Sequence, residues 1–262
     1  MKPYYDRGGI QIFLGDCREV LPTLGPVDHV ITDPPYSEHV HSKSRAGSRK
    51  LDATGFLANY SRAVDFGFAS LETEVRAAVG KEIGRLATRW ALVFSDVESA
   101  SEWRTDMMAG GLDYVRTGAW IKVNATPQFT GDRPGVGFEA ITICHPSGRK
   151  RWNGGGKHAL WSHPVVQNRV DDHGIRCHPT QKPTALMAAL ASQFTDPGEL
   201  ILDPFGGSMT TAVAAKKLGR RCISIELEER WCEIGARRLE QEVMPLFPPT
   251  PAPTDDQGIF AL

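Results

Sequence analysis

Short apolar runs that stop at polar residues alternate with longer amphipathic stretches over most of the 262-residue chain. Apolar runs rich in β-branched residues and bounded by Gly, Pro or Asp predict buried strands, whereas apolar residues three and four apart predict helices. The predicted strands are Gly9–Leu14, Val27–Thr32, Trp90–Asp96, Tyr114–Val123, Phe138–Cys144, Leu200–Leu202 and Cys222–Ile225. The predicted helices are Cys17–Leu24, Leu71–Thr88, Val97–Ala109, Thr184–Phe194, Ala212–Leu218 and Arg230–Val243. Strands joined through helices predict an α/β fold with a mostly parallel sheet and a late antiparallel pair at 114–123 and 138–144.

The strand Val27–Thr32 ends at Asp33-Pro34-Pro35-Tyr36, which gives a first candidate site. Proline has no N–H to continue a ladder, so the turn presents a carboxylate, a free carbonyl and an aromatic ring at the edge of the sheet. The Asp33 carboxylate and the Pro34 carbonyl can accept hydrogen bonds from an exocyclic amine, while Tyr36 stacks on the ring that carries it. This chemistry suits a base taken out of a nucleic-acid helix, and the alternative is an ordinary proline turn that caps a strand.

A second candidate site follows the strand Leu200–Leu202, in the sequence Asp203-Pro204-Phe205-Gly206-Gly207-Ser208-Met209-Thr210-Thr211. A strand, a Gly-Gly turn and a helix start let a ligand approach the backbone closely. Glu226 ends the next strand, where an acid can hold both hydroxyls of a ribose. The turn is not G-x-G-x-x-G and no P-loop lysine follows, so S-adenosylmethionine fits better than a pyrophosphate ligand. Asp203 and Asp33 would attract its cationic groups.

The formal net charge of −1 and the pI near 6.7 do not indicate a nucleic-acid protein, so such a role needs local basic patches. Two segments qualify: the loop 38–57 beside the proline turn, and the irregular region 145–177, which has no acid between His145 and Val170. Their candidate DNA contacts are His39, His41, Lys43, Arg45, Arg49, Lys50, Arg149, Lys150, Arg151, Trp152 and Lys157. The alternatives are a solvated surface loop for the first, and a cover on the sheet with buried tryptophans for the second.

The five cysteines are scattered without a C-x-x-C pair, which favours buried, reduced thiols and argues against a zinc knuckle. The histidines of the region 145–177 do not have metal-ligand spacing either, so we expect no metal. No apolar segment approaches the length that spans a bilayer, and the first residues lack the apolar core of a signal peptide. We therefore expect a cytoplasmic protein without a membrane partner.

These residues resemble the amino-group DNA methyltransferases, which act on adenine N6 or cytosine N4, in the class whose Asp-Pro-Pro-Tyr motif precedes the cofactor motif. Three motifs carry the resemblance, in the order of that class: Asp33–Tyr36, His178–Pro183, and Asp203–Thr211 with Glu226. The resemblance extends from Ile10 to about Leu239. It implies a Rossmann-like class I methyltransferase fold that is circularly permuted, so that the chain begins at the third strand and finishes with the first and second.

The resemblance also implies residue roles. Asp33, Pro34, Pro35 and Tyr36 are the catalytic set; Asp16 and Cys17 lie near the adenine of S-adenosylmethionine, and Thr180 and Lys182 lie near its methionine end. The cofactor-binding set as a whole is Asp16, Cys17, Asp33, Thr180, Lys182, Asp203, Phe205, Gly206, Gly207, Ser208, Thr210 and Glu226.

Two features depart from the family pattern. Met209 stands where the family has a glycine, so we expect its side chain to crowd the start of the following helix and weaken cofactor binding. The recognition region is also short for this family. Sequence specificity is then slight, or a second subunit of a homodimer assists, or the basic loop after Tyr36 shares the work.

The expected activity is direct methyl transfer from S-adenosylmethionine to the N6 amine of a flipped adenine in double-stranded DNA, without a covalent intermediate. Aspartate at position 33, where related enzymes can have serine, favours adenine in this family. The alternatives are a cytosine-N4 methyltransferase, a DNA-binding protein that retains the fold without turnover, and a methyltransferase for RNA or a small molecule.

The expected organisation is one catalytic domain, residues 1–244, into which the basic loop 38–57 and the recognition region 145–177 are inserted. The proline-rich tail 245–262 is expected to be extended and unpacked. Its last residues, Gln257–Leu262, loosely resemble peptides by which bacterial DNA enzymes dock on a replication sliding clamp. A plain disordered end is the favoured interpretation of this tail.

Overall fold

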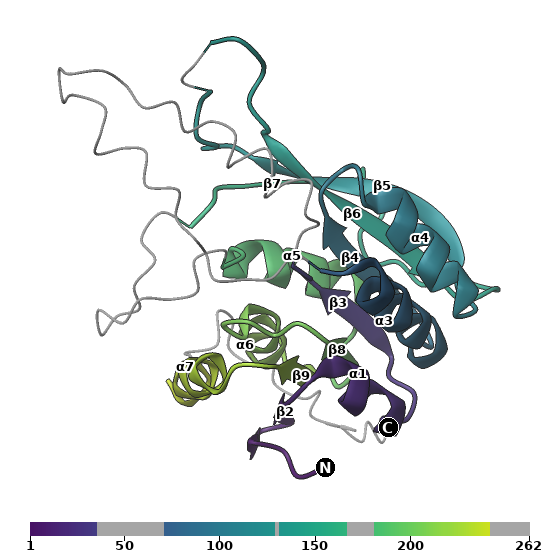
Figure 1. Cartoon of the computed structure of the whole chain (residues 1–262), viewed down its shortest axis with the longest axis vertical. Coiled ribbons are helices and arrows are strands. Elements are labelled where there is room, and N and C mark those ends of the chain that lie inside the picture. The colour runs from purple at the N-terminus through teal and green to yellow at the C-terminus, as the bar shows by residue number, and fades with distance from the viewer. Residues whose placement is uncertain (36–70, 129–130, 167–180, 242–262) are drawn as a thin grey trace, which may run out of the picture.

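The computed structural model describes residues 1–35, 71–128, 131–166 and 181–241, which form a nine-stranded sheet between two layers of helices (Figure 1). The strand order is β1-β2-β9-β8-β3-β4-β6-β5-β7. The strands are β1 Tyr5–Arg7, β2 Ile10–Leu14, β3 His29–Thr32, β4 Ala91–Ser95, β5 Asp113–Lys122, β6 Phe138–His145, β7 Leu160–His163, β8 Leu200–Asp203 and β9 Arg221–Glu226.

Helices cover both faces of the sheet. One layer packs Val79 and Trp103 against it, and the other packs Leu186 and Val213. The first layer consists of α1 Cys17–Val20, followed by the 3-10 turn Leu21–Thr23, then α3 Thr73–Leu86 and α4 Ala100–Ala109. The second layer consists of α5 Thr184–Phe194, α6 Thr210–Lys217 and α7 Glu229–Glu240.

Strands β2, β9, β8, β3 and β4 are parallel, and β6 lies antiparallel between β4 and β5. The predicted α/β class and the late antiparallel pair are therefore confirmed. The central strands β3 and β4 are buried along their whole length, as expected for strands covered on both faces. Adjacent β3 and β8 are far apart in sequence, so their carboxyl ends bring distant residues to one place.

Two strands were not predicted from the sequence. β1 consists of three residues that pair with β2, and β7 is an edge strand beside β5. Both are short and have few apolar residues, so their pairing depends on a neighbouring strand more than on their own pattern.

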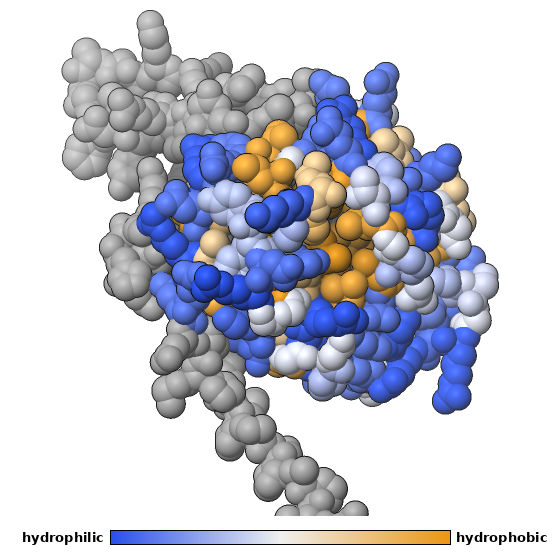
Figure 2. Space-filling model, turned by 90° about the horizontal axis from the view of Figure 1, so that it is seen from below, coloured by the Kyte–Doolittle hydropathy of each residue, from blue (hydrophilic) through white to orange (hydrophobic). Residues whose placement is uncertain are grey.

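Cys17, Cys144, Cys222 and Cys232 are buried free thiols, as the sequence predicted, while Cys177 lies outside the described residues. None of the described helices combines the length and hydrophobicity needed to span a bilayer. From below, the molecule shows mostly hydrophilic side chains around a central hydrophobic area (Figure 2).

Candidate active site

The carboxyl ends of the parallel strands gather the two predicted motifs at one edge of the sheet. Asp33 follows β3, Gly207 lies in the loop after β8, and Glu226 ends β9. A hydrogen bond of 2.6 Å from the Thr32 hydroxyl to Asp203 joins the ends of β3 and β8. On the other side, the Gly15 amide donates to the Glu226 carbonyl at 2.9 Å and joins β2 to β9. This is the edge where ligands bind in open parallel sheets.

Asp203 supports the loop after β8. One carboxylate oxygen accepts from the Thr32 hydroxyl and from the Phe205 amide at 3.1 Å, and the other accepts from the Thr211 hydroxyl at 2.6 Å. The residue is only 2% exposed. Burial raises the pKa of Asp203, and these hydrogen bonds oppose the shift. Asp203 therefore fixes the shape of the loop from within the fold, and its predicted contact with a cofactor stays a prediction.

Glu226 holds the same loop from the neighbouring strand. Its carboxylate accepts the Gly207 amide at 2.8 Å and the Glu228 amide at 2.9 Å, one on each oxygen. Gly207 has a φ of +50°, a left-handed conformation that glycine adopts without cost. Burial raises the pKa of Glu226, although the residue keeps partial exposure. Each oxygen retains a second lone pair, so the side chain can still accept a hydroxyl.

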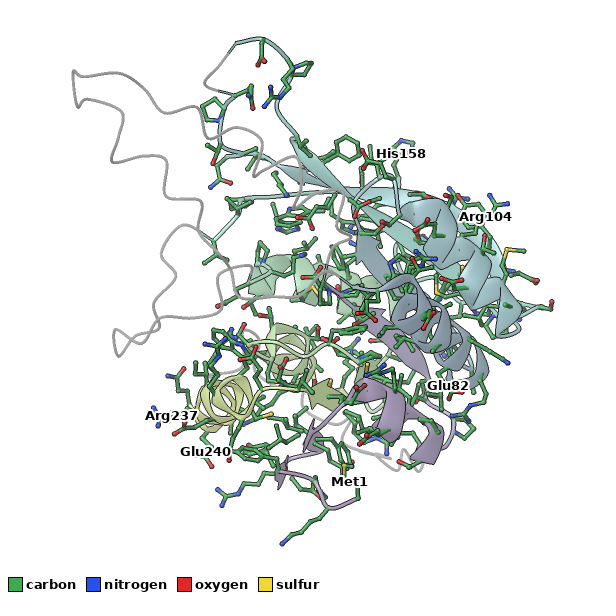
Figure 3. The ribbon with its side chains drawn as sticks, in the orientation of Figure 1. Met1, Glu82, Arg104, His158, Arg237 and Glu240 are labelled. Atoms are coloured by element: carbon green, nitrogen blue, oxygen red, sulfur yellow. The ribbon has the colours of Figure 1, made fainter. Side chains whose placement is uncertain are left out.

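Met209 directly precedes α6. Its side chain is fully buried beneath α7, where a Cβ added at Gly235 would lie 2.1 Å from the Met209 Cγ. Arg237 and Glu240 extend from the outer side of α7 (Figure 3), so Gly235 faces inward. Met209 also has a φ of +60°, a left-handed conformation that glycine adopts more readily than methionine. A glycine on α7 provides space for Met209, whose sulfur would also lie 2.7 Å from a Cβ added at Gly206 in the cofactor loop. The expected effect of Met209 on cofactor binding stays a prediction.

Asp33 forms an ion pair with Lys182, which precedes α5. The Lys182 Nζ lies 2.5 Å from the Asp33 Oδ2, although the two residues are 149 apart in the chain. Burial raises the pKa of Asp33 to about 6, while the Lys182 ammonium acts in the opposite direction. The Asp33 Oδ1 is buried and has no hydrogen-bond partner among the described residues. This carboxylate thus has one oxygen paired with Lys182 and one buried oxygen whose hydrogen-bonding capacity is unused by the described residues.

Asp16 and Cys17 lie at the end of β2, beside Glu226. Asp16 caps α1 by accepting from the Arg18 amide at 2.8 Å, and its ion pair with Arg18 lowers its pKa. Burial raises the pKa of the Cys17 thiol to about 12, so this thiol contributes packing and no charge. Both residues therefore lie near the loop that the sequence assigned to the cofactor.

Of the remaining predicted site residues, some lie in the described part of the chain and others lie outside it. Ser208 and Thr210 are buried, and the Arg238 guanidinium on α7 donates to the Ser208 carbonyl. Phe205 is partly buried against the layer of α1, α3 and α4. Residues outside the described part of the chain are Tyr36, Thr180, His39, His41, Lys43, Arg45, Arg49 and Lys50.

The basic segment Arg149–Trp152 lies at the other edge of the sheet. The Trp90 indole at the start of β4 donates to the Arg151 carbonyl at 2.5 Å, and Arg151 forms a 2.7 Å ion pair with Asp196. Trp152 packs edge-on against Phe194, with ring centres 4.7 Å apart, at the end of α5 opposite to Lys182. Arg149, Lys150, Arg151 and Trp152 lie away from Asp33, because antiparallel β6 returns the chain to the amino edge, and their predicted contact with DNA stays a prediction. Lys157 is exposed in the turn before β7.

Two charged residues at the Asp33 edge were not predicted. Glu139 at the start of β6 lies 3.1 Å from the Lys182 Nζ, and Lys122 at the end of β5 lies 2.6 Å from Glu139. A signal existed in the sequence, since an acid opens one predicted strand and a lysine closes its antiparallel partner. Opposite strand ends of this kind meet at one sheet edge.

The side chains at this edge fit a cationic nucleoside cofactor of the expected kind. Asp33 offers a buried carboxylate oxygen without a hydrogen-bond partner among the described residues, and Glu226 offers a partly exposed carboxylate beside a glycine turn. Carboxylates suit both a positive charge and the hydroxyls of a ribose. Within the described ranges, no group of three His, Cys, Asp or Glu side chains could hold a metal ion.

Comparisons with known proteins agree with this arrangement. The profile of a family described as DNA methylase matches residues 114–237. The type II methyltransferase M.HinfI of Haemophilus influenzae is 26% identical over 253 residues, which cover 88% of this chain and 68% of that protein. The DNA adenine methyltransferase YhdJ of Escherichia coli K12 is 40% identical over 81 residues, 31% of this chain and 27% of that protein.

Solved structures show the same fold. The M1.HpyAVI–SAM complex superimposes with a TM-score of 0.63 at 23% identity, covering 88% of this chain and 99% of that one.

Proposed function

Because the chain belongs to the amino-group DNA methyltransferases, we propose that it methylates the N6 amine of adenine in DNA, with S-adenosylmethionine as the methyl donor. The observation that supports the proposal is the buried Oδ1 of Asp33, which has no hydrogen-bond partner among the described residues, next to Pro34 at the edge where β3 and β8 meet. The similar structure M1.HpyAVI is a complex with SAM, which supports S-adenosylmethionine as the methyl donor. The relative YhdJ is a DNA adenine methyltransferase, which supports adenine as the target base.

The donor would be held mainly by Glu226 through its ribose and by the Gly206–Gly207 backbone, with a smaller contribution from the negative charge of Asp33. S-adenosylmethionine, when bound, supplies an electrophilic methyl group. Asp203 shapes the loop from beneath. The end of β2, with Asp16 and Cys17, would border the adenine ring of the donor.

Asp33 and Pro34 would handle the amine that receives the methyl group. Two acceptors at one turn hold both amine hydrogens and keep the nitrogen lone pair directed away from its ring, which makes the amine a better nucleophile. The excess proton then leaves to solvent, or transiently to Asp33. Asp33 must be ionised to accept the amine hydrogen, so its protonation state controls the rate.

A target base inside a duplex cannot reach this turn, so we propose that the adenine is flipped out and stacked on Tyr36. The basic loop 38–57 follows Tyr36 directly and would contact phosphates close to the flipped base.

Two variants separate donor binding from transfer. We expect Asp33→Ala to slow methyl transfer to duplex DNA by about 100-fold or more, while calorimetry shows donor affinity within a few-fold of the wild type. We expect Glu226→Ala to weaken donor binding by about tenfold, through loss of the ribose contact. Asp113→Ala, at the exposed start of β5, is the matched carboxylate control and should change neither. Equal loss of binding and transfer in Asp33→Ala would contradict the assigned roles.

A further inference from the structure

Lys182 lies between two carboxylates that come from opposite sides of the site. Its Nζ is 2.5 Å from the Asp33 Oδ2 and 3.1 Å from the Glu139 Oε2. The Lys182 side chain is 7% exposed and that of Glu139 is 9% exposed. A buried ammonium with two carboxylates at contact distance has little freedom to move.

Two aromatic rings complete the surroundings of this ammonium. The Lys182 Nζ lies 5.3 Å from the centre of the Phe94 ring and 5.7 Å from that of Trp120, within the range of cation–π attraction. Trp120 pairs with Glu139 across β5 and β6, and Phe94 pairs with Ile141 across β4 and β6. Residues that pair directly point to the same face, so three strands present these side chains to Lys182.

Lys122 holds the far oxygen of Glu139. Its Nζ is 2.6 Å from the Glu139 Oε1 and 5.3 Å from the centre of the Trp120 ring. Asp33, Lys182, Glu139 and Lys122 therefore form a row of alternating charges from the buried turn to a side chain that is 20% exposed. The row is neutral as a whole, which makes its burial tolerable.

We propose that Glu139 is a positioning residue for the amine acceptor: it holds Lys182, which fixes the Oδ2 of Asp33 and leaves the Oδ1 directed to the substrate amine. This inference rests on the proposed function, because it concerns the atom of Asp33 that meets the amine. Glu139 touches neither cofactor nor substrate in this scheme. A carboxylate free to rotate would share its oxygens between the ammonium and the amine, and small errors of this kind can slow a reaction about 100-fold.

The charged groups that face Asp33 are Lys182, Glu139 and Asp203. Burial raises the pKa of Asp33, the Lys182 ammonium lowers it, and the Glu139 and Asp203 carboxylates raise it. Removing the charge of Glu139 should therefore move the acid limb of the pH–rate profile to lower pH, and removing that of Lys182 should move it to higher pH. Opposite shifts from two neighbouring variants would not arise from a general loss of folding.

The test is single-turnover methylation of duplex DNA with S-adenosylmethionine from pH 5 to 8, with donor affinity measured by calorimetry. We expect Glu139→Gln to be about 10- to 100-fold slower with an acid limb at lower pH, and donor affinity close to the wild type. Lys182→Met should have its acid limb at higher pH, and Lys182→Arg should recover part of the rate. Glu199→Gln is the matched control, since Glu199 is paired with Arg89 and His29 but lies at the amino end of β8.

A wild-type rate and acid limb in Glu139→Gln would overturn the inference while the proposed function stands. If Glu139→Gln does not fold, Glu139→Gln/Lys122→Met keeps the net charge of the row, and it should remain slow with the lowered acid limb. Recovery of the wild-type rate in this double variant would also overturn the inference. Absence of methylation by the wild type would instead be a failure of the proposed function.

Discussion

Asp33 has two oxygens in different surroundings, and this asymmetry gives a single residue its proposed role. One oxygen is fixed by Lys182 at 2.5 Å, whereas the other is buried without a partner among the described residues. An unpaired buried acceptor lowers folding stability by about 1–3 kcal/mol, so the fold retains an unsatisfied polar atom at this turn. Such groups are found at functional sites, where a ligand supplies the missing hydrogen bond.

The pH dependence of the wild type tests this residue directly. Burial raises the pKa of Asp33 to about 6, so the methylation rate should fall as the pH drops below 6 and level off above it. A raised carboxyl pKa stabilises the fold as pH falls from 6 towards 4, because the folded state binds the proton more tightly. At pH 5 the methylation rate should therefore be low, although protonation of Asp33 does not lower the free energy of unfolding. Methylation rates and thermal melts from pH 5 to 8 check the two expectations. A methylation rate that does not change with pH in this range would contradict the role of Asp33 as the ionised amine acceptor.

The sequence predicted Asp33, the glycine loop and Glu226, because each ends an apolar strand and such ends share one edge of a parallel sheet. It placed Lys182 near the cofactor but did not predict its pairing with Asp33, which depends on the order of strands. Glu139 and Lys122 were missed for the same reason, since their partners lie on other elements. The sequence alone could not place Arg149–Trp152, because the direction of β6, which carries the following segment to the opposite edge, depends on strand pairing.

At the scale of elements, the loop after β8 is held by α7. Met209 fills the space at Gly235, and Arg238 donates to the Ser208 carbonyl. A left-handed conformation costs a residue such as methionine about 1–2 kcal/mol, and burying its side chain contributes about 1.5–3 kcal/mol. The packing against α7 thus offsets the backbone strain that a glycine would avoid.

A double-mutant cycle tests this contact. We expect Met209→Gly to lower the free energy of unfolding by about 2 kcal/mol, because the cavity outweighs the relief of strain. Gly235→Ala should also destabilise the wild type, since its new Cβ would overlap Met209. The double variant should lose less free energy of unfolding than the sum of the two single losses, by about 1 kcal/mol or more, as measured by urea unfolding. Additive effects would mean that the two residues are not in contact.

At the scale of the whole molecule, the two edges of the sheet have different contents. The carboxyl edge carries Asp33, Glu226 and the charged row, and the amino edge carries the ion pairs of Arg89, Arg151 and Asp196. Helix α5 has 11 residues and joins the two edges, which separates its ends by about 16 Å at 1.5 Å per residue. Arg149 and Lys150 directly precede Arg151, so they lie towards the amino edge, about one helix length from Asp33.

The two basic segments should therefore differ in their effect on DNA binding. We expect Arg149→Ala/Lys150→Ala to change the affinity for duplex DNA less than about twofold, and Arg45→Ala/Arg49→Ala to weaken it and to reduce the salt slope by about 2. Fluorescence anisotropy over a range of salt concentrations measures both quantities. If Arg149→Ala/Lys150→Ala instead weakened DNA binding more than Arg45→Ala/Arg49→Ala, the DNA would have to bind at the amino edge.

We propose that this chain methylates adenine at N6 with Asp33 as the amine acceptor. The most direct test of this proposal is nucleoside mass spectrometry of unmethylated duplex DNA after incubation with S-adenosylmethionine and the protein, beside Asp33→Ala. We expect N6-methyladenine with the wild type and none above background with the variant. N4-methylcytosine would contradict the choice of base, and an unmodified duplex despite measurable donor binding would contradict DNA as the substrate.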